Sequence, residues 1–119
     1  MMTDLRQSLE LLSREARAKG YSEEKSTSIQ LRIFREFVER ERERLHYEHR
    51  AGASGHHVVQ QWTAMVDAVV IEAYRAVMLN GEGTPGECAL IALGGYGRGA
   101  LNICSDVDLL FLFAGEVPE

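Results

Sequence analysis

Two aspartates and a glycine-rich segment are the residues of this chain whose types and spacing suit chemistry. Asp106 and Asp108 are separated by one residue and open an apolar run that continues through LLFLF, while residues 94–99 read GGYGRG. In an extended strand that starts at Asp106, the alternation of side chains directs both carboxylates to the same face. Two carboxylates held that close repel each other unless a cation lies between them, and hard oxygen ligands suit Mg²⁺. The pair therefore predicts a magnesium site.

The glycine-rich segment supplies the complementary chemistry, for an anion. Glycines permit positive φ and close approach, so Gly94, Gly95 and Gly97 allow several backbone N–H groups to converge on a phosphate. Arg98 adds a guanidinium, either as a phosphate contact or as a structural brace for the loop, and Ser105 adds a hydroxyl donor just before the aspartates. A phosphate cradle beside a carboxylate pair is typical of a nucleotidyl-transfer site.

The glycine pattern also occurs in two kinds of structure that suit this chain less well. Gly95, Gly97 and Ala100 satisfy G-x-G-x-x-G/A, the outline of a dinucleotide-binding fingerprint, which requires a helix of about ten or more residues to follow. Only six residues separate Gly99 from Asp106, so a Rossmann crossover does not fit. A plain tight turn between buried strands accounts for the glycines but leaves two charges at the start of an apolar strand unexplained.

The string GGYGRGALNICSDVDLLF resembles the nucleotidyltransferase signature of the DNA polymerase β superfamily, in which Gly-Gly or Gly-Ser follows an apolar residue and Asp-x-Asp comes a short way downstream. Within that superfamily it looks most similar to the PII uridylyltransferase/uridylyl-removing enzymes of bacterial nitrogen control. The family usually has Pro and an aromatic residue before its Ser-Asp pair, where this chain has Ile103 and Cys104. The matched residues are Gly94, Gly95, Tyr96, Gly97, Arg98, Gly99, Leu101, Ser105, Asp106 and Asp108.

This resemblance implies roles for the residues named above. Asp106 and Asp108 are implied as catalytic and Mg²⁺-binding residues, with a nucleotide-binding set of Gly94, Gly95, Gly97, Arg98 and Ser105. UTP is implied as the donor, a tyrosine hydroxyl of the PII regulatory protein as the acceptor, and pyrophosphate as the leaving group. The signature does not fix the base, because uridylyl and adenylyl transferases share these phosphate and metal devices.

The superfamily also needs a third carboxylate from a later strand, and Glu116 lies too near the end of this chain to take that part. We therefore expect an amino-terminal fragment of such an enzyme, a poor catalyst when alone. Two alternatives stay open: a non-catalytic helical interaction module with a remnant motif, and a minimal nucleotidyltransferase of toxin–antitoxin type. The second of these usually begins close to its first strand, without the helical residues found upstream here.

The segment upstream of the motif predicts about three helices. Residues 3–18 carry an apolar stripe, Ser22 begins a second amphipathic stretch, and a third helix from Gly55 or His57 to Leu79 has the widest apolar face. Turn formers fill residues 80–87. The predicted fold is α+β: a helical region over residues 1–80 packs on the start of an incomplete nucleotidyltransferase domain over residues 81–119.

Charge and composition exclude several function classes. The net charge of −5 over 119 residues argues against a general nucleic-acid binder, and no apolar run is long enough to span a membrane. A polar amino terminus and only two cysteines predict a cytoplasmic protein with free thiols. The alternating charges of residues 39–44 predict a solvated helix face with i,i+4 pairs. The four histidines, expected to be solvated or capping residues and not metal ligands, are His46, His49, His56 and His57.

Overall fold

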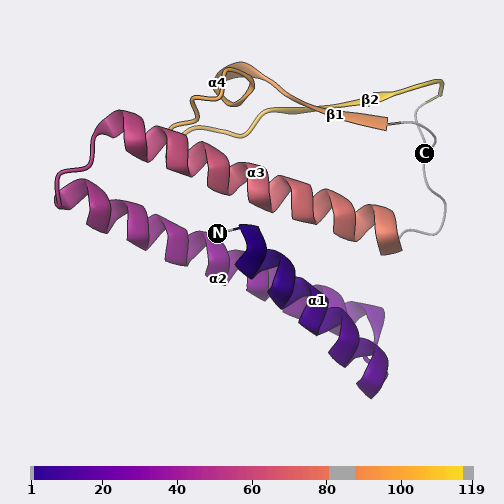
Figure 1. Ribbon diagram of the computed structural model, residues 1–119. Coiled ribbons are helices and arrows are strands. Elements are labelled where there is room, and N and C mark those ends of the chain that lie inside the picture. The colour runs from indigo at the N-terminus through magenta and orange to yellow at the C-terminus, as the bar shows by residue number, and fades with distance from the viewer. Residues whose placement is uncertain (1, 81–87, 117–119) are drawn as a thin grey trace.

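Three long helices precede a short β-hairpin in the computed structural model, which describes residues 2–80 and 88–116 (Figure 1). This arrangement confirms the predicted α+β fold with its three helices and two strands. The turn expected over residues 80–87 lies outside the described residues from residue 81 onward. The elements are α1 (Met2–Lys19), α2 (Glu23–Arg50), α3 (Gly55–Asn80), β1 (Cys88–Ala92), α4 (Gly94–Gly97) and β2 (Leu109–Phe113).

The junction between α1 and α2 shows why the first two helices end and begin where they do. Gly20 follows α1 with a φ of +66°, a left-handed conformation that glycine adopts without strain. The N–H of Tyr21 then donates to the carbonyl of Ala16 at 3.0 Å, which satisfies one of the last carbonyls of α1. Ser22 caps α2 by accepting a hydrogen bond from the N–H of Lys25 at 3.1 Å.

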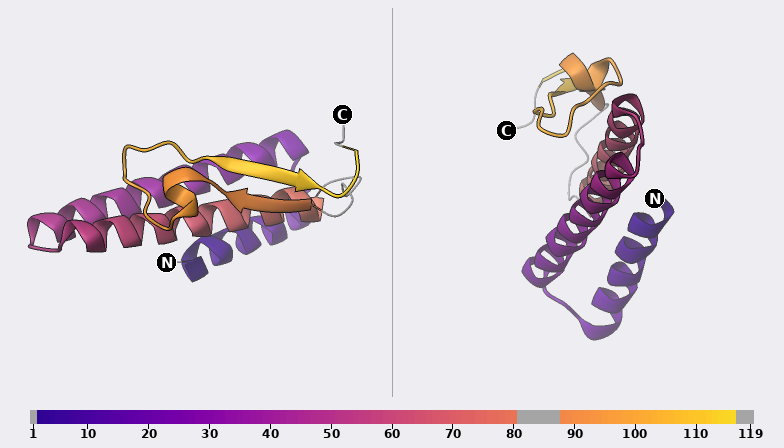
Figure 2. Two further views of the ribbon diagram at one scale, coloured as in Figure 1. Left: turned by 90° about the horizontal axis from the view of Figure 1, so that it is seen from above. Right: turned by 90° about the vertical axis from the view of Figure 1, so that its left-hand side faces the viewer.

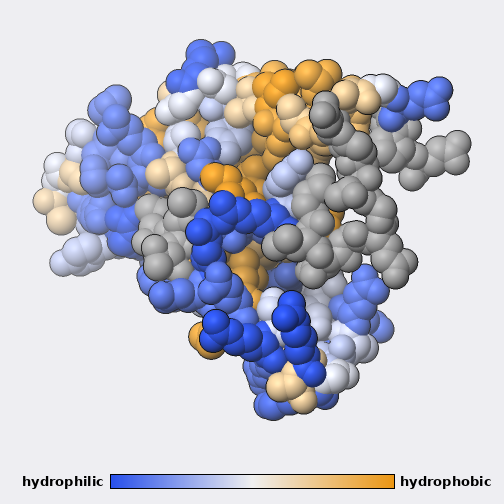
Figure 3. Space-filling model, turned by 45° about the vertical axis from the view of Figure 1, so that its right-hand side comes forward, coloured by the Kyte–Doolittle hydropathy of each residue, from blue (hydrophilic) through white to orange (hydrophobic). Residues whose placement is uncertain are grey.

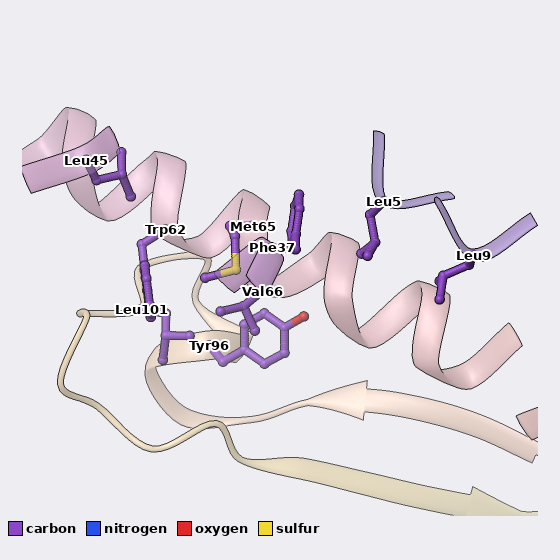
Figure 4. Close-up of a cluster of buried hydrophobic side chains, with 9 residues drawn as sticks. All are labelled: Leu5, Leu9, Phe37, Leu45, Trp62, Met65, Val66, Tyr96 and Leu101. Carbon is purple, nitrogen blue, oxygen red and sulfur yellow. The ribbon is translucent and has the colours of Figure 1, made fainter. Parts of the chain in front are cut away.

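Helix α3 occupies the middle of the molecule. It packs against α1 and α2 on one side, and the hairpin lies along its other side (Figures 1 and 2). The resulting layered shape is thin, with principal extents of 47, 39 and 19 Å. One buried cluster crosses all these layers (Figure 4); its members are Leu5, Leu9, Phe37, Leu45, Trp62, Met65, Val66, Tyr96 and Leu101. The wide apolar face predicted for α3 is therefore shared between the helices and the glycine turn.

The alternating charges of residues 39–44 are more than a solvated face. Glu41 is only 8% exposed and accepts two hydrogen bonds from Arg44, at 2.7 and 3.0 Å. Arg44 also donates to Glu48 at 2.7 Å and to the side-chain carbonyl of Gln61 on α3 at 3.4 Å. The prediction is wrong at Glu41 because this side of α2 packs against α3, and a carboxylate placed there needs its own cation.

The two strands pair antiparallel, from Cys88 opposite Phe113 to Ala92 opposite Leu109. This pairing agrees with the short reach between the glycines and aspartates, since a dinucleotide-binding unit has parallel strands. Strand β2 begins at Leu109, so the prediction that it starts at Asp106 is wrong. A further backbone hydrogen bond joins the N–H of Leu93 to the carbonyl of Asp108 at 3.0 Å. After β1 the chain forms α4, so no strand lies opposite Asp106 for it to pair with.

The hairpin keeps much of its apolar surface open. Hydrophobic side chains gather at the top of the molecule in Figure 3, where the hairpin lies in Figure 1. The described helices include none that is both long and apolar enough to cross a membrane. The exposed large apolar residues of the hairpin and its connections are Ile91, Leu93, Val107, Leu110, Phe111 and Leu112.

Candidate functional site

The glycine-rich segment folds as a single helical turn, α4, followed by a bend. Its later N–H groups are used inside the turn: those of Gly97, Arg98, Gly99 and Ala100 donate to the carbonyls of Leu93, Gly94, Tyr96 and Gly95, at 2.9 to 3.1 Å. The N–H groups of Gly94, Gly95 and Tyr96 have no backbone acceptor within the described part of the chain. The backbone amide of Gly97 is thus already used within the turn, whereas those of its first three residues have no backbone acceptor among the described residues.

Two of the glycines are required by the backbone, Gly94 by its positive φ and Gly97 by close approach. Gly94 has a φ of +59°, and a Cβ atom added there would lie 3.2 Å from Oδ2 of Asp108. A Cβ atom on Gly97 would lie 2.7 Å from the carbonyl oxygen of Ala92, a distance that real side chains do not tolerate. Gly94 thus brings the start of α4 against the Asp108 carboxylate, and Gly97 brings α4 against β1.

Asp106 and Asp108 are both exposed, and neither forms an ion pair or side-chain hydrogen bond with any other described residue. The Leu93–Asp108 backbone hydrogen bond fixes Asp108 beside the first residue of α4. Unpartnered carboxylate oxygens of this kind suit a hard cation such as Mg²⁺. Residues 2–80 and 88–116 contain no group of three or more His, Cys, Asp or Glu side chains that could hold a metal ion. Both carboxylates are thus uncommitted to any other described side chain.

Arg98 and Ser105 lie on either side of the connection between α4 and β2. Arg98 is the C-cap of α4, and its Nη2 atom would lie 3.9 Å from a Cβ atom on Gly95, so the guanidinium folds back over the turn. It forms no ion pair within the described residues. Ser105 is exposed, and its N–H donates to the carbonyl of Asn102 at 3.0 Å. Positive charge thus lies over the turn whose first residue contacts Asp108.

Two residues of α3 that contact this region, Thr63 and Asp67, were not singled out from the sequence. The Tyr96 hydroxyl donates to Oδ1 of Asp67 at 2.6 Å, and the N–H of Leu101 donates to Oγ1 of Thr63 at 3.0 Å. Burial, followed by the hydrogen bond to Asp67, raises the pKa of Tyr96 above its usual range, so the phenol stays protonated. Thr63 and Asp67 are polar residues one turn apart within the apolar pattern of α3, and that interruption was the available signal.

The histidines and cysteines lie outside this site or take no contact in it. His57 Nε2 lies 2.8 Å from Oε2 of Glu48, and His49 Nδ1 lies 2.9 Å from the carbonyl oxygen of Ala53. Both contacts connect the end of α2 to the residues that lead into and begin α3. Cys88 and Cys104 are unpaired, as predicted.

Comparison with known proteins points to one group of enzymes. The chain is 33% identical over 88 residues to the bifunctional uridylyltransferase/uridylyl-removing enzyme of Chromobacterium violaceum, an alignment covering 74% of this chain and 10% of that protein. The protein of the same name from Nitrosococcus oceani is 34% identical over 89 residues, covering 75% and 10%. That of Cupriavidus metallidurans is 49% identical over 51 residues, covering 43% and 5%.

The chain is a distant relative of bifunctional uridylyltransferase/uridylyl-removing enzymes. It spans about a tenth of the length of the first two of these relatives. No family model matches the chain. No solved structure matches it either. The relationship to uridylyltransferase/uridylyl-removing enzymes therefore rests on sequence.

Proposed function

We propose that this chain forms the metal-binding and triphosphate-binding part of a nucleotidyltransferase, and that the complete site transfers UMP from UTP to a tyrosine of a PII protein. One observation carries the proposal: the Asp108 carboxylate, free of any partner in the described chain, lies against Gly94 at the start of the glycine turn. This proximity supports the proposal, because the Asp108 carboxylate lies near backbone amides that have no backbone acceptor among the described residues. The names of the related enzymes support the choice of uridylyl transfer.

Asp106 and Asp108 would hold Mg²⁺, which supplies charge neutralisation of the nucleotide phosphates when bound. The donor set fits this ion, because both groups are exposed carboxylates without a competing cation among the described residues. Two carboxylates leave several positions of an octahedral shell for water and phosphate oxygens, which is how Mg²⁺ is usually held at phosphate sites. We expect a further carboxylate from elsewhere in the complete enzyme.

The residues of the turn would bind and orient the triphosphate. The first amides of α4 donate toward phosphate oxygens, and Arg98 adds a positive charge over the same turn. Ser105 offers a hydroxyl donor from the connection. In the transfer itself, an acceptor hydroxyl oxygen bonds to the α-phosphorus and its proton passes to water, while the bond from that phosphorus to the α–β bridging oxygen breaks and pyrophosphate leaves. Such chemistry depends mainly on positioning and electrostatics.

Calorimetric titration of the chain with UTP, with and without Mg²⁺, tests the proposal. We expect binding that requires Mg²⁺ and that weakens about tenfold or more in Asp106→Asn and Asp108→Asn, because each change removes a charged ligand. Asp4→Asn, the same substitution at an exposed aspartate of α1, serves as the matched control. Binding without Mg²⁺, or unchanged binding in Asp108→Asn, would contradict the proposal.

A second candidate is an interaction module whose transferase motif no longer binds nucleotide. The exposed apolar side chains of the hairpin favour it, since contiguous apolar surface often marks a protein contact. Under this alternative, UTP and Mg²⁺ produce no binding heat, and Asp106→Asn behaves as the original chain in every assay. The same titration therefore separates the two functions.

A further inference from the structure

Helix α3 holds the glycine turn at two places. Thr63 and Asp67 lie four residues apart on this helix, and each accepts a hydrogen bond from the turn: Thr63 from the N–H of Leu101, and Asp67 from the hydroxyl of Tyr96. Thr63 also donates its own hydroxyl hydrogen to the carbonyl of Val59 at 2.8 Å, so its lone pairs point toward Leu101. The described residues show no other side-chain hydrogen bond from the helices to residues 94–101.

Both points of attachment pair a polar contact with a buried side chain. Tyr96 is 7% exposed and Leu101 only 1%, and both belong to the cluster that includes Trp62 and Val66 of α3 (Figure 4). The residues between them, 97–100, are exposed. The turn is therefore fixed at its middle and its end, while its open part faces solvent.

The Tyr96–Asp67 bond is the stronger attachment. At 2.6 Å it has the length expected for a hydroxyl that donates to an ionised carboxylate, which is a stronger bond than one between neutral groups. Without Asp67 the Tyr96 hydroxyl would lose its one acceptor among the described side chains, and a hydrogen bond to a charged group contributes more than one to a neutral group. The orientation of α4 thus depends on a residue 29 positions earlier in the chain.

A change in the orientation of α4 acts directly on the proposed site. Gly94, two residues before Tyr96, lies near the Asp108 carboxylate, since a Cβ atom added there would be 3.2 Å from its Oδ2, and Leu93 donates a backbone hydrogen bond to Asp108. If Tyr96 tilts, the first amides of α4 move relative to Asp108, while Asp106 and Asp108 keep their own positions next to β2. Nucleotide binding and cation binding therefore respond differently to loss of the attachment.

We propose that Asp67 and Thr63 are positioning residues of the nucleotide site, which hold the glycine turn at the distance from Asp108 that a metal-bound triphosphate requires. This inference rests on the proposed function. Neither residue touches the nucleotide; each acts through Tyr96 or through the Leu101 backbone.

The test compares MgUTP affinity with the affinity for the cation alone in the full 119-residue chain. Calorimetry gives the first, and electron paramagnetic resonance of Mn²⁺, used as a probe for the Mg²⁺ site, gives the second. We expect Asp67→Ala to weaken MgUTP binding about tenfold, the effect of losing a hydrogen bond to a charged group, with Mn²⁺ affinity unchanged. Asp67→Asn keeps an acceptor oxygen and should recover part of the loss. Gln60→Ala, at an exposed polar position of the same helix, is the matched control.

Coupling between the partners gives a second measurement. Tyr96→Phe keeps the buried ring and removes only the donor, so adding Asp67→Ala to it should weaken MgUTP binding little further. Thr63→Val should also weaken MgUTP binding, with faster hydrogen exchange of the Leu101 amide. Thermal unfolding followed by circular dichroism establishes that each variant is folded.

Distinct outcomes overturn distinct statements. If the original chain binds MgUTP in an Asp108-dependent way but Asp67→Ala and Tyr96→Phe bind equally well, the positioning role is wrong and the proposed function stands. If Asp67→Ala weakens Mn²⁺ and MgUTP equally, the residue serves stability and not position. If the original chain shows no Asp108-dependent binding, the proposed function fails, and the positioning role fails with it.

Discussion

Buried charged side chains are paired in the helices, whereas charged side chains are unpaired in the described hairpin and its turn. In the helices, each buried carboxylate has an arginine: Glu41 pairs with Arg44 at 2.7 Å, and Glu72 pairs with Arg6 at 3.0 Å and Arg75 at 3.3 Å. In the described part of the hairpin and its turn, the aspartates and the arginine form no ion pair at all. Charges that neutralise one another hold a scaffold together, whereas unpaired charges of both signs remain available to a ligand.

The burial of apolar side chains also differs between the helices and the hairpin. Phe37 of α2 is 2% exposed, while Phe111 of β2 is 54% exposed. The hairpin contributes to the buried cluster mainly through the turn, by Tyr96 and Leu101. The stability of this chain therefore resides mainly in its helices, and the hairpin is packed against them on one side only.

The largest expected effect comes from truncating matched phenylalanines in the two regions. Phe37→Ala should lower the free energy of unfolding by about 3–5 kcal/mol, because it removes a fully buried ring and leaves a cavity. Phe111→Ala should cost less than about 1 kcal/mol, since Phe111 is already 54% exposed. Urea unfolding followed by circular dichroism measures both. Equal losses would mean that the hairpin contributes to the core as much as α2 does.

A smaller effect is expected where the turn meets β1. Gly97→Ala should destabilise the chain by about 1–3 kcal/mol, because the new Cβ atom has no room beside the Ala92 carbonyl and the backbone must shift. Gly55→Ala, with nothing near its Cβ position, should be neutral or slightly stabilising. Chemical denaturation compares the two variants. A neutral Gly97→Ala would show that α4 does not approach β1 this closely.

The attachment of the turn to α3 predicts a change at alkaline pH. The pKa of Tyr96 is raised above its ordinary value of 10.0, mainly by burial, so its stabilising contribution is complete below that pH and is lost as the pH rises through the higher folded value. The stability of the original chain should therefore fall above pH 10.0 more steeply than that of Tyr96→Phe. Thermal unfolding over this range, with absorbance at about 295 nm to follow ionisation, checks the prediction. Parallel curves for the two proteins would contradict it.

The corner between α2 and α3 predicts the smallest effect, at acid pH. A hydrogen bond from His57, followed by one from Arg44, holds the pKa of Glu48 below its ordinary value of 4.5. The associated stabilisation is present above that value and is lost as the pH falls through the lower folded pKa. His57→Ala should flatten the decline of melting temperature between about pH 5 and pH 3, whereas His46→Ala, at an exposed position of α2, should not. If the melting temperature of His57→Ala falls with decreasing pH as steeply as that of the original chain, His57 does not stabilise the ionised Glu48 carboxylate.

Local patterns in the sequence predicted the elements well, and tertiary contacts determine where prediction stopped. The helices follow from apolar spacing, and Ser22 marks a helix start because its side chain caps the next turn. Nothing local distinguishes Glu41 from Glu39 two residues earlier, because only packing against α3 makes one buried and the other exposed. In the same way, β2 begins at Leu109 because its partner strand β1 ends at Ala92 and is followed by α4.

Asp106 and Asp108 were recognised as site candidates from their spacing, and their service as metal ligands remains a prediction. The contribution of Asp67 could not be read from the chain, because its bond to Tyr96 joins residues on separate elements. A carboxylate on α3 is indistinguishable from any other solvated acid until the turn is placed on it. The polar interruption of the apolar stripe at Thr63 and Asp67 was the only local trace of that contact.

Because α3 packs against both the other helices and the glycine turn, binding of a ligand to the folded turn is thermodynamically coupled to unfolding of the helices. A nucleotide that binds only the folded turn raises the unfolding free energy of the whole unit, by about 2.7 kcal/mol at a hundred times its dissociation constant. The helices, which hold nearly all of the circular dichroism signal, then report on occupancy of a site that they do not contain. The melting temperature of α1, α2 and α3 can therefore be used to measure ligand binding at the hairpin.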